Sequence, residues 1–288
     1  MPWPFDRGYM QLALAAGIVV GACAPLIGTF LVQRRLSLLG DGIGHLAFTG
    51  VAVGLLAGVW PVWTALAAAV AGALGIEWLR SRRHATGDLA LALFFYGGIA
   101  AGVVITGLAG ATTVNLYSYL FGSILTVTPG DVAMVAAVGV LILVTVAVAG
   151  RALFAVVLDE EAARVAGVPV RALNLTLSIL TAVTVVAAMR VVGVLLVAAL
   201  MVLPVASGQV LARSFRGTLL TSAGIGVLSV VAGLTAARAW GLAPGGAIVL
   251  TAALVFVVAA LTAGRRRPAR IHQAATHVGD DHQHGPPE

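Results

Sequence analysis

Asp41 and His45 are the residues whose types and spacing point most directly to chemistry. They lie four positions apart in the segment GDGIGHLAFTG, so a helix would place both side chains on one face. A carboxylate and an imidazole can together ligate a divalent cation, and the same pair can relay protons. The structural alternative is that Asp41 caps the start of its helix, beside Gly40 and Gly42, and that His45 bonds to a neighbouring carbonyl group.

The solvent around this segment helps to decide between these interpretations. The chain has 288 residues, of which 60% are hydrophobic and 10% charged, and its mean hydropathy is +1.04. This composition is too apolar for a surface that faces water, so lipid must surround most of the chain. An Asp at the centre of a membrane helix costs about 2.5–3.5 kcal/mol, and such groups usually mark functional sites. We therefore favour metal or proton handling by Asp41 and His45.

A second candidate is the acidic and basic stretch 159–169, DEEAARVAGVP, which lies between two apolar segments. Its pattern E-A-A-x-x-x-G is formed by Glu161, Ala162, Ala163 and Gly167. Alanine favours a short helix, and a glycine followed by Pro169 would end it. We expect this helix to dock on a partner protein, the alternative being an ordinary charged helix at the membrane surface.

A third candidate is the polar tail after the last apolar segment, which we expect to be a disordered segment of residues 268–288. It contains four histidines: His272, His277, His282 and His284. Histidine-rich flexible tracts bind zinc, nickel or copper loosely, and the alternative is a solvated tail without a ligand. The irregular spacing predicts weak metal capture and no ordered site.

The elements that must position these residues are membrane-spanning helices. Nine apolar segments predict an all-α protein, a polytopic transmembrane helical bundle of about 8–9 spanning helices within residues 1–267. The segments are 9–32, 38–58, 61–79, 88–108, 131–150, 172–189, 191–211, 217–237 and 244–263. The more polar stretch 111–130 is open to three interpretations: a loop, a re-entrant piece or an interfacial helix.

The arginines orient this bundle. The net charge is +6 and all 17 basic residues are Arg, placed at the ends of apolar segments, which argues against a nucleic-acid surface. In the nine-helix arrangement only Arg7, Arg190 and Arg238 lie on one side, and the other 14 lie opposite. The rule that cytoplasmic loops are positively charged therefore predicts an external N-terminus and a cytoplasmic C-terminus.

Other polar residues in the apolar segments have simpler interpretations. We expect Glu77 to pair with the nearby arginines and Asp131 to stand at a helix start, where it complements the helix dipole. Pro204 is expected to kink its helix. Cys23 is the single cysteine, so no intrachain disulfide or cysteine-based metal site is possible.

Motifs for catalysis are missing from the sequence. Without any Lys the chain cannot contain the phosphate loop G-x-x-x-x-G-K-[ST], so an ATPase that drove transport would be a separate subunit. Neither G-x-S-x-G nor H-E-x-x-H occurs, and a membrane-embedded enzyme would need further polar residues inside the membrane. We expect a transport subunit rather than an enzyme.

These features together resemble the permease subunits of bacterial ABC importers for zinc, manganese or iron, the zinc-permease-like family. The resemblance covers about residues 9–263. It rests on the blocks RRLSLLGDGIGHLAFTGVAVG (34–54), LFGSIL (120–125), DEEAARVAGV (159–168), VVGVLLVAALMVLPVASG (191–208) and APGGAIVL (243–250).

The resemblance implies a multi-pass permease in the bacterial inner membrane. Such a permease is a homodimer that binds two ATP-binding cassette ATPase subunits and receives its ion from an extracytoplasmic metal-binding protein. The Asp and His that line the ion path of the family correspond to Asp41 and His45. Its coupling helix corresponds to the segment around Glu161 to Gly167. Members commonly carry Ser before this His and Leu-Pro after it, whereas here Gly44 precedes His45 and a serine ligand is missing.

The leading hypothesis is therefore an ATP-driven importer of divalent metal ions, with no stably bound cofactor. Zinc is expected first because imidazole suits it, and manganese second because it prefers more oxygen ligands. The alternatives are an iron importer of the same family, an importer of a siderophore-type or cobalamin-type metal chelate, and a proton-coupled secondary transporter. A chelate needs a wide path without an Asp–His pair, and a secondary transporter has no use for a docking helix.

Overall fold

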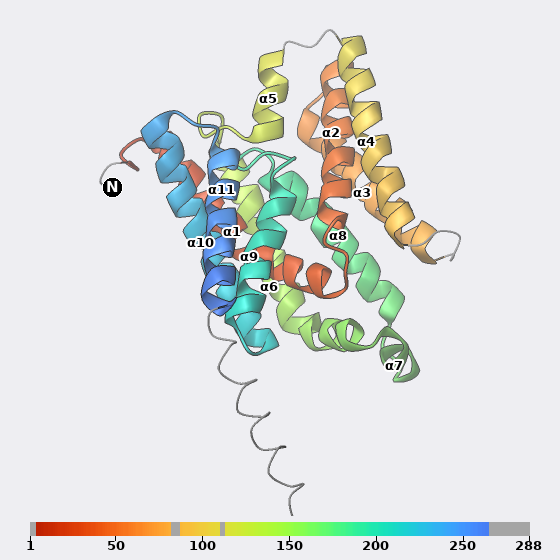
Figure 1. Ribbon diagram of the computed structural model, residues 1–288. Helices are drawn as coiled ribbons and strands as arrows, with labels where there is room; N and C mark the ends of the chain where they lie inside the picture. Colours follow the sequence, from red (N-terminus) through yellow and green to blue (C-terminus); the bar gives the residue numbers. More distant parts are fainter. Residues whose placement is uncertain (1–3, 82–86, 110–112, 265–288) are drawn as a thin grey trace, which may run out of the picture.

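The chain folds into a bundle of helices, shown in Figure 1. The computed structural model describes residues 4–81, 87–109 and 113–264, and no strand occurs within these ranges. The helices are α1 (Gly8–Gln33), α2 (Leu39–Ala57), α3 (Pro61–Ser81), α4 (Gly87–Ala109), α5 (Thr113–Phe121), α6 (Pro129–Leu158), α7 (Glu160–Val165), α8 (Val170–Ala188), α9 (Val197–Leu211), α10 (Phe215–Trp240) and α11 (Pro244–Gly264).

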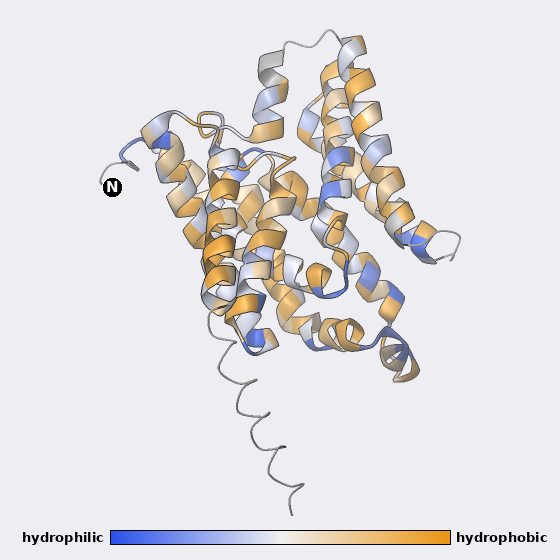
Figure 2. Cartoon of the chain, viewed as in Figure 1, coloured by the Kyte–Doolittle hydropathy of each residue, from blue (hydrophilic) through white to orange (hydrophobic). Residues whose placement is uncertain are grey.

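Eight of these helices are long and apolar enough to span a membrane: α1, α2, α3, α4, α6, α8, α10 and α11. α9 is apolar but has 15 residues, which is short for a full crossing. Most of the helical residues are hydrophobic in Figure 2, and many of the hydrophilic residues lie near helix ends and connections. The predicted fold class, an all-α polytopic bundle, is confirmed.

The predicted span 191–211 is wrong in its first part. α8 ends at Ala188, and the chain from 189 to 196 is not regular helix before α9 begins. Gly193 has a φ of 93°, a left-handed conformation that a helix cannot contain. The freed backbone N–H groups of Val194 and Leu195 donate to the carbonyl oxygens of Tyr119 and Leu120, at 2.9 and 3.3 Å.

α5 provides those carbonyl groups, so the polar stretch 111–130 contains a short helix rather than only a loop. Next to it, the first turn of α6 is fixed by a capping box between Thr128 and Asp131, as expected for a carboxylate at a helix start. The Asp131 carboxylate also lies 3.5 Å from Arg190. α5, the start of α6 and the segment 189–196 therefore meet at one end of the bundle.

α1 runs through the middle of the bundle and packs against α6, α8, α9 and α10. Glycines allow the close approaches: a Cβ on Gly21 would lie 2.8 Å from the carbonyl oxygen of Gly226, and a Cβ on Gly28 would lie 2.0 Å from that of Met201. Only hydrogen fits at these positions. Such contacts replace the hydrophobic driving force that helices lack inside lipid.

The two ends of the bundle carry different polar groups. The ends of α1 and α3, the helix α7 and the start of α8 lie together, and they carry Arg34, Arg80, Arg164 and Arg171. At the opposite end Arg238 bonds to Tyr9 and Arg190 bonds to the carbonyl oxygen of Thr126 at 2.8 Å. This division agrees with the arginine grouping made from the sequence; Arg82, Arg83 and the arginines after 264 lie outside the described residues.

Exposed tryptophans mark both ends. Trp60, Trp63 and Trp240 lie 61–73% exposed at the end away from α7, and Trp78 lies 55% exposed near the last turn of α3. Tryptophan is enriched where a membrane helix passes from hydrocarbon to water. The distribution therefore suits a bundle that crosses a bilayer between these two levels.

Candidate functional site

α2 positions the Asp41–His45 pair. Asp41 stands in the first turn of this helix and His45 one turn later, so both lie on one face, and both are partly buried. Leu38 is the N-cap residue and no side chain caps the helix. The alternative in which Asp41 serves as a helix cap is therefore wrong.

The imidazole of His45 packs edge-on against the ring of Phe95 from α4, with ring centroids 4.5 Å apart. Its Nδ1 atom is buried and has no hydrogen-bond partner within residues 4–81, 87–109 and 113–264. Among the described residues neither the His45 ring nor the Asp41 carboxylate forms a side-chain hydrogen bond, and Asp41 forms no ion pair. The alternative in which His45 bonds to a neighbouring carbonyl is also wrong, and the pair has unused ligating capacity.

Glycines bring two other elements close to this pair. A Cβ on Gly98 of α4 would lie 2.9 Å from the backbone carbonyl carbon of His45, and Thr49 donates its hydroxyl to the Gly98 carbonyl oxygen at 2.7 Å. On the next face of α2, a Cβ on Gly44 would lie 3.0 Å from the carbonyl oxygen of Val194. A serine at position 44 would crowd that carbonyl group.

The pair supplies two protein ligands from one chain. Within the described residues there is no group of three or more His, Cys, Asp or Glu side chains that could hold a metal ion. Cys23 lies elsewhere, buried between α1 and α6 with its sulfur 3.8 Å from the carbonyl oxygen of Gly139. A cation at Asp41 and His45 would therefore complete its shell with backbone oxygen, water or groups from another chain.

The predicted short helix in the segment 159–169 is confirmed as α7. The Asp159 carboxylate caps it and accepts bonds from the backbone N–H groups of Glu161 and Ala162, both at 2.9 Å. Gly167, with a φ of 80°, turns the chain after the helix. Val165 is 90% exposed on this polar helix.

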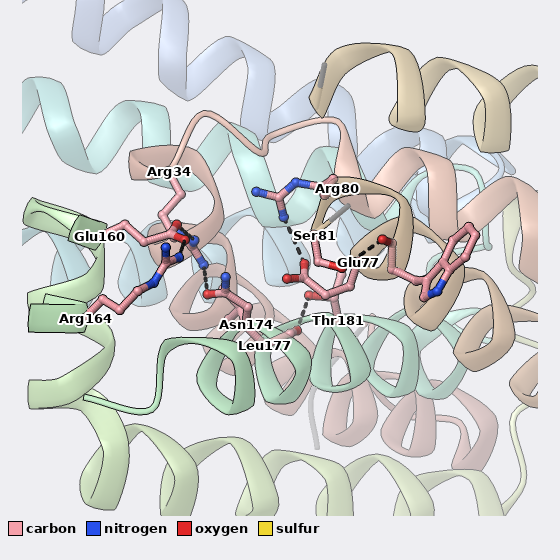
Figure 3. A network of polar contacts seen from close by, with 10 residues as sticks. Arg34, Glu77, Arg80, Ser81, Glu160, Arg164, Asn174, Leu177 and Thr181 are labelled. Carbon is pink, nitrogen blue, oxygen red and sulfur yellow. Dashed lines mark hydrogen bonds and ion pairs between the residues drawn. The ribbon is translucent and has the colours of Figure 1, made fainter. Parts of the chain in front are cut away.

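A groove of about 920 Å³ lies beside α7, between it, the last turn of α3 and the start of α8. Its charged and polar lining comprises Glu77, Arg80, Ser81, Glu160, Glu161, Arg164, Arg171 and Asn174. Glu77 bonds to Arg80 at 3.0 Å, which confirms the predicted pairing of Glu77 with a nearby arginine (Figure 3).

Arg34 is a residue that the sequence analysis did not single out, because it looked like one more positive charge in a loop. Its side chain is 7% exposed and bonds to Glu160 at 2.8 Å and to Asn174 at 2.5 Å. Burial lowers the pKa of the Arg34 guanidinium below its ordinary value, and the Glu160 carboxylate acts in the opposite direction. Only the fold brings these partners together. The histidines of the tail, from His272 onward, lie outside the described residues.

Comparisons with known proteins identify a matching family and its members. The sequence profile described as the ABC 3 transport family matches residues 6–263. The manganese transport system membrane protein MntC of Halalkalibacterium halodurans is 32% identical over 252 residues, which cover 87% of this chain and 86% of that protein. The manganese import system permease protein ScaB of Streptococcus parasanguinis is 30% identical over 269 residues, which cover 93% of this chain and 95% of that protein.

A solved structure has the same fold. It is PsaBC from Streptococcus pneumoniae in complex with Fab, and it matches with a TM-score of 0.79 at 30% sequence identity. The match covers 88% of this chain and 91% of that chain. The arrangement of the helices is therefore shared over nearly the whole length.

Proposed function

The chain belongs to the ABC 3 transport family, and from this premise we propose that it is the membrane-spanning subunit of an ATP-driven importer of divalent metal ions. It is a multi-pass membrane permease and a transport component. The proposal adds the direction of transport, the metal and the residues that meet the ion on its way.

The observation that carries the proposal is the unused ligating capacity on α2. Among the residues that the structure describes, the buried Nδ1 of His45 has no partner, and the Asp41 carboxylate stands one turn away on the same face. A buried polar atom without a partner is costly, so its retention needs a reason. A cation that passes along this face gives such a reason, since it would bind to both groups for a short time and then dissociate from them.

Manganese is the first candidate for the cargo. The metal-specific names among the relatives above are manganese systems, which does not support the earlier preference for zinc. The ligand chemistry agrees, because one carboxylate and one imidazole with oxygen donors around them suit manganese, whereas zinc sites usually collect several His or Cys ligands. Zinc is the second candidate.

The partners follow from the same family. We expect a homodimer, two ATP-binding cassette ATPase subunits seated against α7, and an extracytoplasmic binding protein that delivers the ion. Exposure of Val165 on α7 supports docking, because an apolar side chain there would be covered by a partner. ATP binding in the partner would displace α7 and tilt the bundle around Asp41 and His45, which switches access from one side to the other.

Replacement of His45 tests the proposal. In a strain that lacks the gene, His45→Ala should lower the uptake of isotope-labelled Mn²⁺ about tenfold or more while the permease remains in the membrane, because a ligand is lost. Ser222→Ala is the matched control, since the Ser222 hydroxyl is also buried without a partner in the described part of the chain but belongs to α10. Normal uptake by His45→Ala, or an equal loss in Ser222→Ala, would refute the assignment. Labelled Zn²⁺ in parallel decides the metal.

A further inference from the structure

Arg34 is placed where three elements meet. It follows the last residue of α1, and α2 begins at Leu39, so it lies in the short junction between the two helices. Its guanidinium bonds to Glu160 of α7 through one nitrogen and to Asn174 of α8 through the other, as Figure 3 shows. Asn174 is 7% exposed, so both the cation and this partner are shielded from water.

The junction itself is firmly held. The backbone N–H of Leu36 donates to Leu31 at 2.9 Å, and that of Leu39 donates to Leu36 at 3.0 Å. Both Leu36 and Leu39 are buried in the core. A displacement of Arg34 would therefore be passed to the first turn of α2, where Asp41 stands.

The Glu160 carboxylate bonds to two arginines that belong to different elements. One oxygen accepts from Arg34, and the other accepts from Arg164 at 3.0 Å. Arg164 belongs to α7 itself, four residues after Glu160, and its side chain is 59% exposed. Of these two bonds, only the one to Arg34 connects α7 to another part of the bundle.

A buried guanidinium keeps its charge, and separating it from its carboxylate would leave that charge unpaired. α7 cannot move independently of the α1–α2 junction without breaking this contact. We propose that Arg34 is a positioning residue that transmits displacement of α7 to α2, so that ATPase movement reaches the Asp41–His45 pair. This inference rests on the proposed function and adds a role that lies outside the metal path.

The test measures coupling rather than activity alone. The permease is purified with its own ATPase subunit and reconstituted in liposomes with its binding protein, and Mn²⁺ transported and ATP hydrolysed are measured in the same vesicles. In Arg34→Gln the number of ions moved per ATP should fall about fivefold or more, in the range by which single residues change coupling between sites. Arg80→Gln, which removes a partly buried arginine of the same groove whose ion pair with Glu77 stays within α3, should stay within about twofold of wild type.

Two further variants separate coupling from folding. Arg34→Lys keeps the charge but cannot reach Glu160 and Asn174 at once, so it should show an intermediate ratio. Asn174→Ala keeps the ion pair and should lose less than Arg34→Gln. An unchanged ratio in Arg34→Gln, an equal fall in Arg80→Gln, or loss of both Arg34 variants from the membrane would overturn the inference. Wild-type vesicles that move no metal would instead refute the proposed function.

Discussion

Asp41 differs from the other solvent-shielded carboxylates of the described chain in having no partner. Glu77 pairs with Arg80, Glu160 pairs with Arg34, and Asp131 caps α6 and approaches Arg190. Among described carboxylates that are shielded from solvent, Asp41 alone lacks a hydrogen bond or an ion pair. Its position in the first turn of α2 gives it some support from the helix dipole, typically less than the cost of burying an unpaired charge. Stability alone gives no reason to keep a carboxylate there.

Replacing Asp41 with asparagine should therefore separate function from stability. Asp41→Asn should lower Mn²⁺ uptake about tenfold or more, as loss of a charged ligand would, while the unfolding temperature of the purified permease stays the same or rises. Glu77→Gln is the comparison, because it breaks an ion pair at the same end of the bundle and should leave uptake intact. Asp41→Asn with normal uptake, or with a lower unfolding temperature than wild type, would contradict the prediction.

At the scale of elements, the broken segment between α8 and α9 is stabilised by backbone contacts with α5 and α11. Gly122 and Gly193 both have positive φ, and a Cβ on either would lie 2.4 Å from a backbone oxygen of the other segment. Gly245, near the start of α11, closes the same cluster: its Cβ would lie 1.8 Å from the carbonyl oxygen of Val192. Val194 of this segment also lies against Gly44 of α2. The placement of the segment therefore directly affects α2, the helix that carries Asp41 and His45.

Two adjacent glycines test this packing. Gly245→Ala should destabilise the permease by about 1–3 kcal/mol or more, because the added methyl group overlaps a backbone oxygen. Gly246→Ala should be neutral or slightly stabilising, since nothing lies within 4 Å of its Cβ and alanine favours helix. Thermal unfolding of the two purified variants gives the comparison. Equal unfolding temperatures would mean that the segment 189–196 is not held against α11 in this way.

At the scale of the whole molecule, the bundle has one end with arginines, a groove and α7, and another with Arg190, Arg238 and the α5 cluster. The cytoplasmic assignment of the arginine-rich end follows from the sequence rule on positive charge. The proposed docking of an ATPase on α7 requires this orientation, because ATP is available inside the cell. Orientation is thus the global property on which the mechanism depends.

Cysteine labelling measures that orientation. The native Cys23 is 5% exposed, so background reaction with a thiol reagent should be low. Asp6→Cys, before α1, should react with a membrane-impermeant maleimide in intact cells. Arg213→Cys, between α9 and α10, should react only after the cells are permeabilised; both positions are exposed. The reverse pattern would place α7 outside and exclude its docking on an ATPase.

The sequence by itself determined the features that depend on local composition and helical spacing. Long apolar stretches predict spanning helices wherever lipid is the solvent, an i, i+4 spacing places Asp41 beside His45, and the Ala-rich segment with Gly167 predicts α7 and its end. Each of these follows from residues that are near neighbours in the chain.

Only the tertiary structure decided the features that depend on distant partners. The segment 191–196 is as apolar as a spanning helix, and its break becomes visible only when α5 accepts its backbone hydrogen bonds. Arg34 meets Glu160 and Asn174, which lie 126 and 140 positions away. Likewise, the unpartnered Nδ1 of His45 is a property of the surrounding helices, because hydrogen bonding inside a protein depends on which groups the whole chain brings within reach.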